Sequence, residues 1–404
     1  MNLESCNKDK LYLIALSGGP DSMALLNMLY QEKYSLIVCF VNYHHRNNVD
    51  EEQEMVINYV KKLNYKLEIK DCFYQEKDGN FENWARIERY MFFKEMLNKY
   101  HAEGCFVGHH QDDLIETYLL QKQRGYVSYY GLKHINVIKG VKIIRPLLAY
   151  KKIDLLNYCK NNNIPFSIDY TNDDINLKRN YLRKNIINNL NDNDRKDILI
   201  KIDLENQKIE QINQKIDTFI NDNEINLDKI NELNEEEFSR LIFKFVNKYI
   251  DLELSINRIK EIKNQLKKSG NVIIDLNNEY KLIKEYNKLS IINNLKYFYS
   301  IKVDKPSIIE NEFIYFDLLT NPNKFYIKKD SYPLTIKIVE KNQKIKIGNI
   351  HKNINRLLID EKIPYLKRLY WPMIVNNKNE IIFIPRKDFD EDNLFIVKTK
   401  KNMI

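Results

Sequence analysis

The segment LYLIALSGGPDSMALLNMLY (residues 11–30) joins an apolar run to a helical pattern through a short turn. LYLIAL, residues 11–16, has the length and the unbroken apolar character of a strand that is buried on both faces. MALLNMLY, residues 23–30, places apolar side chains at helical spacing. The glycines and the proline of SGGPDS, residues 17–22, mark a turn between the two. The segment therefore predicts a buried strand that passes directly into a helix.

Strand-like and helix-like segments continue to alternate after this turn. Because strands that alternate with helices of 10–20 residues are typical of βαβ units, we predict an α/β fold, a parallel sheet with helices on both faces. Ligands of such sheets bind beyond the carboxyl ends of the strands. The further strands are predicted at residues 35–44, 65–72 and 105–110, and the helices at 51–63, 80–100 and 151–163.

The rest of the chain differs in pattern from this first part. Residues 190–203 are polar and rich in Asn and Asp, which suggests a boundary, and helical patterns follow at 204–221, 234–250 and 255–268. Residues 271–293 read as a small meander, and the last hundred residues as strands around one short helix at 351–361. We therefore predict three domains, an α/β domain (1–192), a mainly helical middle domain with a small β meander (193–296) and a small α+β C-terminal domain (297–404).

Composition limits the class of protein. A chain of 404 residues exceeds the usual size of one domain. Its net charge of +8 favours a polyanionic partner, although a Lys-rich composition alone produces the same value. No run of about 18 apolar residues and no signal-peptide pattern occurs, so we expect a cytoplasmic protein without a membrane partner. The five cysteines are widely spaced and form no CxxC pair, which argues against a disulfide framework or a zinc ribbon.

The turn SGGPDS has the chemistry of a phosphate-binding loop. Gly18 and Gly19 allow a tight turn and a close approach of the backbone to an anion. The amides at the start of the following helix, together with the helix dipole, can hold phosphate oxygens. Ser17 and Ser22 can add hydroxyl donors, and Asp21 can bind Mg²⁺. The simpler alternative is an ordinary strand–helix turn, and a Walker loop is excluded because no GK[ST] follows.

A second polar cluster, GHHQDDLIET (residues 108–117), begins at a strand end and enters a helix. His109 and Asp113 are four residues apart and Asp113 and Glu116 three apart, so we expect them to share one helix face. Two carboxylates on one face can hold a metal ion or an ammonium group, and His109 can orient a phosphate or transfer a proton. A metal site built from His109 and His110 is disfavoured because adjacent side chains point apart. The alternative is a solvated acidic helix start.

These motifs resemble a known family. SGGPDS resembles the loop of the N-type PP-loop ATP pyrophosphatases, and HHQDDLIET, followed by Arg124-Gly125 and RPLL (145–148), is similar to the tRNA(Ile)-lysidine synthetase family. Further blocks that match in order are VNYHHR (41–46), ARIERY (85–90), DYTND (169–173) and RNYLR (179–183).

The C-terminal residues resemble the final, tRNA-holding domain of that family more loosely. The matching segments are KIKIG (344–348), RLLIDEKIP (356–364) and WPMIV (371–375). That family usually carries LKK before its apolar pair, whereas this chain has Ile354-Asn355-Arg356. The departure leaves open which side chain contacts RNA there.

The resemblance implies a ligase that forms a C–N bond. Such an enzyme uses ATP and Mg²⁺ to adenylate O2 of the wobble cytidine, position 34, in the isoleucine tRNA with a CAU anticodon. The ε-amine of free L-lysine then attacks C2, which releases AMP after the earlier loss of pyrophosphate and changes both the codon and the amino-acid identity of the tRNA. A homodimer is left open. The implied ATP-binding residues are Ser17, Gly18, Gly19, Pro20, Asp21, Ser22, Asn42 and Arg46.

The resemblance also implies roles for side chains outside the loop. Asp21 would hold Mg²⁺, Arg86 would lie near the α-phosphate, and His109 and Asp113 would complete the catalytic group. Lysine would bind to Asp113 and Glu116. The implied tRNA contacts are Arg179, Arg183, Lys352 and Arg356, and for Arg179 and Arg183 surface arginines on a solvated helix are the alternative.

Two rival functions keep the same fold. A PP-loop tRNA thiolase generally uses paired cysteines or an iron–sulfur cluster, and the absence of CxxC argues against it. A non-catalytic tRNA-binding protein would be expected to carry degenerate motifs, whereas SGGPDS (17–22) and HHQDDLIET (109–117) are intact.

Overall fold

The computed structural model describes the chain apart from short segments, which are residues 45–48, 168–177, 222–223, 229, 251–253, 286, 294–297, 320–326, 341, 386–394 and 398–404. The chain divides into two compact units, unit 1 (Met1–Ile212) and unit 2 (Asn213–Ile404).

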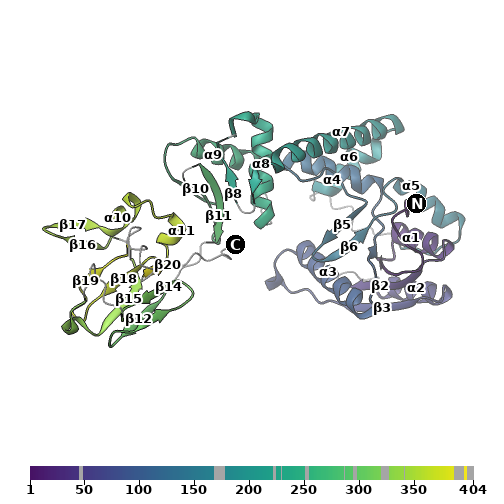
Figure 1. Ribbon diagram of the computed structural model, residues 1–404. Coiled ribbons are helices and arrows are strands. Elements are labelled where there is room, and N and C mark those ends of the chain that lie inside the picture. The colour runs from purple at the N-terminus through teal and green to yellow at the C-terminus, as the bar shows by residue number, and fades with distance from the viewer. Residues whose placement is uncertain are drawn as a thin grey trace. The chain divides into compact units, whose positions relative to one another are not determined.

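Unit 1 is built on a six-stranded sheet with the order β3-β2-β1-β4-β6-β5 (Figure 1). Neighbouring strands are parallel from β3 to β6, and only β5 runs antiparallel, as a hairpin with β6. This hairpin was not predicted. The strands are β1 (Leu11–Leu16), β2 (Ser35–Asn42), β3 (Lys66–Asp71), β4 (Cys105–Phe106), β5 (Ile135–Ile138) and β6 (Val141–Ile144).

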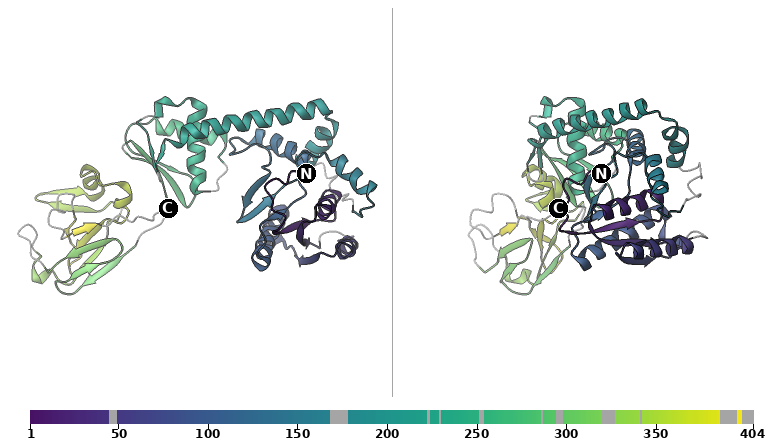
Figure 2. Two further views of the ribbon diagram at one scale, coloured as in Figure 1. Left: turned by 45° about the vertical axis from the view of Figure 1, so that its right-hand side comes forward. Right: turned by 90° about the vertical axis from the view of Figure 1, so that its right-hand side faces the viewer.

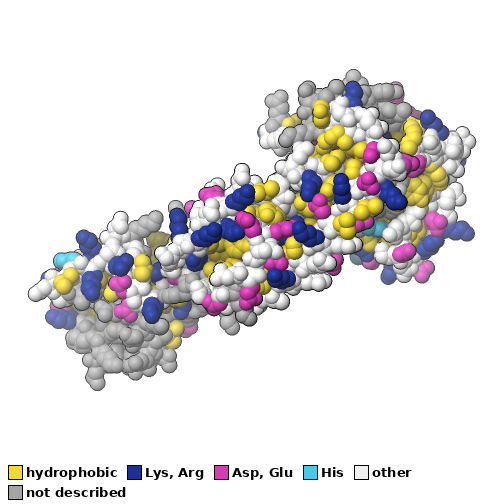
Figure 3. All heavy atoms as spheres, turned by 90° about the horizontal axis from the view of Figure 1, so that it is seen from above, with side chains coloured by type: hydrophobic (Ala, Val, Ile, Leu, Met, Phe, Trp, Pro, Cys, Tyr) yellow, Lys and Arg dark blue, Asp and Glu magenta, His cyan; other side chains and the backbone are white. Residues whose placement is uncertain are grey.

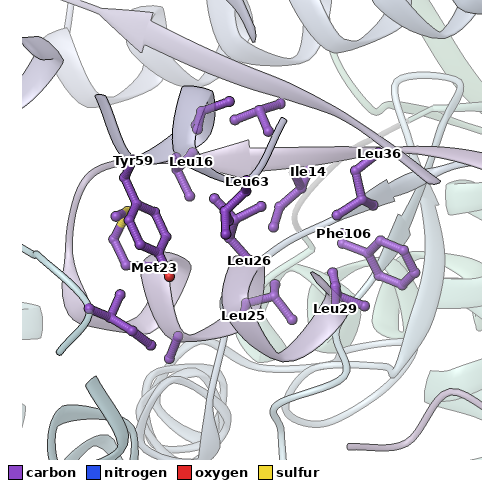
Figure 4. Close-up of a cluster of buried hydrophobic side chains, with 14 of the residues drawn as sticks. Ile14, Leu16, Met23, Leu25, Leu26, Leu29, Leu36, Tyr59, Leu63 and Phe106 are labelled. Atoms are coloured by element: carbon purple, nitrogen blue, oxygen red, sulfur yellow. The ribbon is translucent and has the colours of Figure 1, made fainter. Parts of the chain in front are cut away.

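Helices cover both faces of this sheet, as the alternation of side chains along β1 shows. Ile14 and Leu16 pack on one side in a cluster with Met23 of α1, which Figure 4 shows in close-up. Leu13 points to the other side, into a cluster with Phe93 of α3. The predicted α/β fold is therefore confirmed, and its layers can be followed in Figure 2. The helices of this unit are α1 (Pro20–Gln31), α2 (Val49–Lys62), α3 (Phe81–Tyr100), α4 (Gln111–Arg124), α5 (Lys152–Asn161), α6 (Lys178–Asn185) and α7 (Asp192–Asp217).

Helix α7 corrects one prediction. The polar composition of residues 190–203 predicts a boundary before a helix at 204, but the helix already begins at Asp192. The side chain of Asn191 accepts a hydrogen bond of 2.9 Å from the backbone N–H of Asp194. Because acidic side chains in a first turn interact favourably with the helix dipole, the polar run starts a helix here. The border between the two units falls inside α7.

Unit 2 carries a five-stranded sheet with the order β7-β8-β11-β10-β9, in which β9, β10 and β11 form the antiparallel meander predicted at 271–293. Helices α8 (Glu235–Tyr249) and α9 (Ile256–Leu266) belong to the same part of the chain. The strands of this sheet are β7 (Ile220–Asn221), β8 (Glu224–Asn226), β9 (Val272–Asp275), β10 (Tyr280–Glu285) and β11 (Lys288–Asn293).

The remainder of unit 2 is rich in strands around a separate buried cluster that includes Phe316, Ile336 and Ile374. Its sheets have the orders β12-β15-β18-β19, β13-β14-β20 and β16-β17. The three-domain division with borders after residues 192 and 296 stays a prediction. The elements are β12 (Ser300–Val303), β13 (Ile308–Glu310), β14 (Ile314–Asp317), β15 (Leu334–Ile338), β16 (Lys344–Ile347), β17 (Ile350–Asn353), α10 (Ile354–Asp360), α11 (Tyr365–Arg368), β18 (Pro372–Val375), β19 (Ile381–Phe383) and β20 (Phe395–Val397).

The surface carries charged side chains of both signs, and the cysteines form no disulfide among the described residues. On the face shown in Figure 3, Lys and Arg side chains are interspersed with Asp and Glu. All five cysteines are free thiols, and Cys39, Cys72, Cys105 and Cys159 are buried. Among the described residues, no helix has the length and apolar character needed to cross a membrane.

A buried ion pair anchors α7 to α4. Arg195 lies 2.5 Å from Asp112 (Nη1 to Oδ1), and it also donates to the backbone oxygen of Ile187 at 2.9 Å. Both charged side chains are buried. Since an unpaired buried charge is costly, the two residues depend on each other for their placement.

We expect Asp112→Asn and Arg195→Met each to lower the free energy of unfolding of unit 1 by about 3 kcal/mol, because each leaves the partner charge buried and unpaired. The double variant should lose less than the sum of the two. Urea unfolding followed by circular dichroism measures these values. Glu32→Gln, which breaks an exposed pair with Lys8, is the control and should change stability little. Strictly additive losses in the double variant would contradict the coupling.

Candidate active site

The loop between β1 and α1 closes on itself. Gly18 has a φ of +76°, a backbone conformation that favours glycine. The backbone N–H of Ser17 donates to Oγ of Ser22 at 3.2 Å, and that hydroxyl donates to the backbone oxygen of Gly19 at 3.1 Å. Gly19 caps α1 without a side-chain hydrogen bond, and Pro20 begins the helix. The first amides of α1 are thus not capped by the side chain at this position, which suits an anion site.

The end of β4 packs directly against this loop. A Cβ atom on Gly108 would lie 3.1 Å from backbone atoms of Asp21 and Ser22, closer than nearly all real contacts of this kind. The missing side chain therefore lets the segment that leads into α4 touch the loop. Gly108 was not singled out from the sequence, because a close approach of backbone from two distant segments leaves no local pattern.

Asp21 lies at the contact between the two segments. Within the part of the chain that the structure describes, its Oδ1 is buried and lacks a hydrogen-bond partner. Its Oδ2 lies 3.5 Å from Nε2 of His110. An oxygen ligand left unsatisfied in this way fits the Mg²⁺ expected at Asp21. Among the described residues, no group of three or more His, Cys, Asp or Glu side chains could hold a metal ion.

His110, rather than His109, connects the loop to the acidic residues of α4. Helix α4 begins at Gln111, so His110 is its N-cap and His109 lies before the helix, contrary to the expectation that His109 shares a helix face with Asp113. Nδ1 of His110 accepts from the backbone N–H of Asp112 at 3.2 Å. The backbone N–H of His110 donates to Oδ2 of Asp113 at 2.9 Å. A polar residue three positions before an acid is the signal of a capping box that could have revealed this role.

The two adjacent histidines have pKa values that move in opposite directions. Burial lowers the pKa of His109 to about 4, and the positive charges of Arg145 and Arg89 add to this effect against the opposing charge of Asp113. Burial would also lower the pKa of His110, but its hydrogen bond to Asp21 and the charge of Asp113 outweigh burial and raise it. At neutral pH, His109 is therefore uncharged.

Asp113 and Glu116 share one partner, the guanidinium of Arg183 on α6. Nη2 of Arg183 lies 2.7 Å from Oδ1 of Asp113, and its Nε donates to Glu116. Glu116 is only 3% exposed. Burial would raise the pKa of Asp113, yet the neighbouring histidines and Arg183 hold the pKa below its usual value. The predicted acidic pair therefore holds the guanidinium of Arg183, whose side chain is half-buried, at 33% exposed, rather than fully solvated on the surface.

The remaining described residues that the sequence predicts for the site lie outside the contacts between the phosphate loop and α4. Asn42 is 1% exposed and braces the end of β2, donating to Gln53 at 2.9 Å and accepting from the backbone N–H of His44 at 2.9 Å. Arg86 is exposed on α3, with its guanidinium 5.7 Å from the ring centre of Tyr90. Arg46 and the side chain of Arg179 fall outside the described residues, and Lys352 and Arg356 are exposed in unit 2.

The opposite pKa shifts predict opposite effects of His109→Gln and His110→Gln on the pH dependence of stability. As the pH falls from about 6.5 to about 4, unfolded His109 binds a proton and folded His109 does not, so the wild type loses stability. His109→Gln should remove part of this loss. The contribution of His110 is present below its ordinary pKa and is lost as the pH rises through the raised pKa, so His110→Gln should cost more at acid than at alkaline pH. Urea unfolding over a pH series measures both slopes, and slopes of equal sign for the two variants would contradict the assignment.

Comparisons with known proteins identify the family. A family profile described as a PP-loop domain matches residues 2–190. A tRNA(Ile)-lysidine synthase from Mycoplasma mycoides subsp. mycoides SC is 39% identical, with 95% of this chain and 98% of that protein covered. The tRNA(Ile)-lysidine synthase of Mesoplasma florum is 35% identical, with 92% of this chain and 96% of that protein covered. That of Bacillus subtilis is 25% identical, with 95% of this chain and 92% of that protein covered. A likeness of this extent, over nearly the whole of both chains, shows that this chain belongs to the tRNA(Ile)-lysidine synthase family.

Proposed function

We propose that the protein ligates free L-lysine to C2 of the wobble cytidine of an isoleucine tRNA with a CAU anticodon, at the expense of ATP. The observation that carries the proposal is the junction of a phosphate loop with a buried acidic pair. His110 lies 3.5 Å from Asp21 and 3.6 Å from Asp113, so the two halves of the site meet at one side chain. An adenylating group and an amine-binding group are the two requirements of this reaction.

The loop Ser17–Ser22 would perform the adenylation half. Its backbone and the amides of α1 would hold the phosphates of ATP, and Arg86 would approach the α-phosphate, where negative charge develops. Bound at Asp21, Mg²⁺ would supply positive charge beside the phosphates. The products of this half are pyrophosphate and a cytidine that carries AMP on O2.

Asp113 and Glu116 would perform the lysine half. Their contact with the guanidinium of Arg183 supports a site that prefers a cation. A lysine ammonium that binds here must lose a proton before its nitrogen attacks C2, and the carboxylates can accept that proton. The C–N bond then forms, and the bond between C2 and the adenylated oxygen breaks to release AMP.

We expect Asp113→Asn and Glu116→Gln to reduce kcat/KM for lysine by about 10²-fold, because each removes one charge from a buried ion-binding site. Lysine-independent formation of pyrophosphate in the presence of tRNA should persist, since the adenylation half lies at the loop. The measurement is the transfer of radiolabelled lysine to tRNA transcripts with CAU and altered anticodons.

Glu103→Gln is the matched control, because Glu103 belongs to an exposed pair with Lys142 in the same unit. Glu103→Gln should leave lysine transfer and lysine-independent pyrophosphate formation near the wild-type values. Label that enters tRNA equally well in Asp113→Asn would refute the lysine site. Label that enters tRNAs without a cytidine at position 34 would refute the proposed substrate.

Lys352 of β17 and Arg356 of α10 are proposed to contact tRNA phosphates, and both side chains are exposed. We expect Lys352→Gln and Arg356→Gln to weaken tRNA binding and to reduce the slope of log affinity against log salt by about 1 for each lost phosphate contact. Filter binding over a salt series measures the slope. Lys378→Gln removes another exposed lysine of unit 2 and is the control. Unchanged slopes in both test variants would exclude these residues from the interface.

A further inference from the structure

Arg145, in the segment RPLL, is 3% exposed and is held on three sides. Its Nη1 donates to the backbone oxygen of Lys133 at 2.9 Å and to Oδ1 of Asn136 at 2.6 Å. Its Nε donates to Nδ1 of His109 at 3.1 Å. The backbone N–H of Arg145 also donates to the backbone oxygen of His134, at 2.8 Å. The loop before β5 and the β5–β6 hairpin thus orient the guanidinium.

The hydrogen bond from Nε of Arg145 to Nδ1 of His109 determines which nitrogen of His109 carries the proton. A guanidinium has donors only, so the nitrogen that it contacts must offer a lone pair. Nδ1 of His109 is therefore unprotonated, and a neutral ring must carry its proton on Nε2. We infer that Arg145 is a positioning residue that keeps His109 in the Nε2–H form, as a hydrogen-bond donor that has no nitrogen free to act as a general base.

This inference rests on the proposed function for what His109 does in the reaction. A donor next to a site of phosphoryl chemistry can stabilise an oxygen that gains negative charge. The proton that the lysine amine loses would then go to a carboxylate, Asp113 or Glu116, rather than to His109. The charged groups that act on His109 are Asp113, Arg145, Arg89 and His110, and together with burial they favour its neutral form.

The test is ¹⁵N NMR of the full-length chain labelled at histidine, with the His109 signals assigned from their loss in His109→Gln. We expect a protonated Nε2, an unprotonated Nδ1 and no titration until the pH falls to about 4. A protonated Nδ1 in the wild type at neutral pH would overturn the inference. This measurement needs no variant of Arg145 and no turnover.

Two variants test the part that Arg145 plays. Arg145→Met removes the donor and should give a mixture of both His109 tautomers, whereas Arg145→Lys keeps a donor and should retain the Nε2–H form. Arg240→Gln changes a buried arginine of unit 2 and should leave the His109 signals unchanged. A wild-type tautomer in Arg145→Met would show that another group sets it and would overturn the role of Arg145.

Activity gives a second readout. Arg145→Met should lower kcat for lysine transfer by about tenfold or more with little change in KM for lysine, and Arg145→Lys should recover part of the loss. An unchanged kcat in a variant with mixed tautomers would overturn the catalytic part of the inference. If the wild type transfers no lysine to any tRNA but shows the Nε2–H signals, the proposed function fails and the tautomer assignment stands.

Discussion

The close approach between Gly108 and the backbone of Asp21 and Ser22 determines how the site is assembled. The parallel pairing of β1 with β4 places the ends of these strands at the same edge of the sheet. A residue without a side chain lets the segment after β4 lie this close to the phosphate loop, since a Cβ atom would lie 3.1 Å from the loop backbone and would force the two segments apart by a few tenths of an ångström. As a result, the N-cap of α4 reaches Asp21. The phosphate loop and the acidic start of α4 thus form one site, although nearly ninety residues of chain separate them.

The buried charges of this site alternate in sign, and this alternation explains why two adjacent histidines behave differently. His110 lies between Asp21 and Asp113, so its positive form is favoured. His109, one residue earlier, contacts Arg145 and is held neutral. Successive residues of an extended segment point in opposite directions, which places one ring against carboxylates and the other against a guanidinium. Two rings of the same chemistry thereby become available for different tasks.

Local pattern was enough to predict the parts of this structure that depend on local interactions. The strand at 11–16 and the helix at 80–100 were predicted to within a residue, because apolar periodicity and turn residues mark them. The spacing of Asp113 and Glu116 also indicated a shared face. The hydrogen bonds that complete the site join residues far apart in the chain. Arg183 pairs with acids 67 and 70 residues away, and Arg145 contacts a histidine 36 residues away. Such pairings depend on the topology of the sheet, and no sequence spacing encodes them.

The occupancy of the acidic pair by Arg183 limits how a substrate can bind there. Glu116 is buried and the side chain of Asp113 is 16% exposed, and leaving a buried carboxylate without a counter-charge costs about 3–5 kcal/mol. The pair is therefore stabilised by a counter-charge, which in this structure is the guanidinium of Arg183. A cation that replaces Arg183 leaves the net charge of the site unchanged, whereas a cation that shares the carboxylates with Arg183 adds one positive charge. A neutral group that displaced Arg183 would leave both carboxylates without a counter-charge, so an exchange at this position favours another cation.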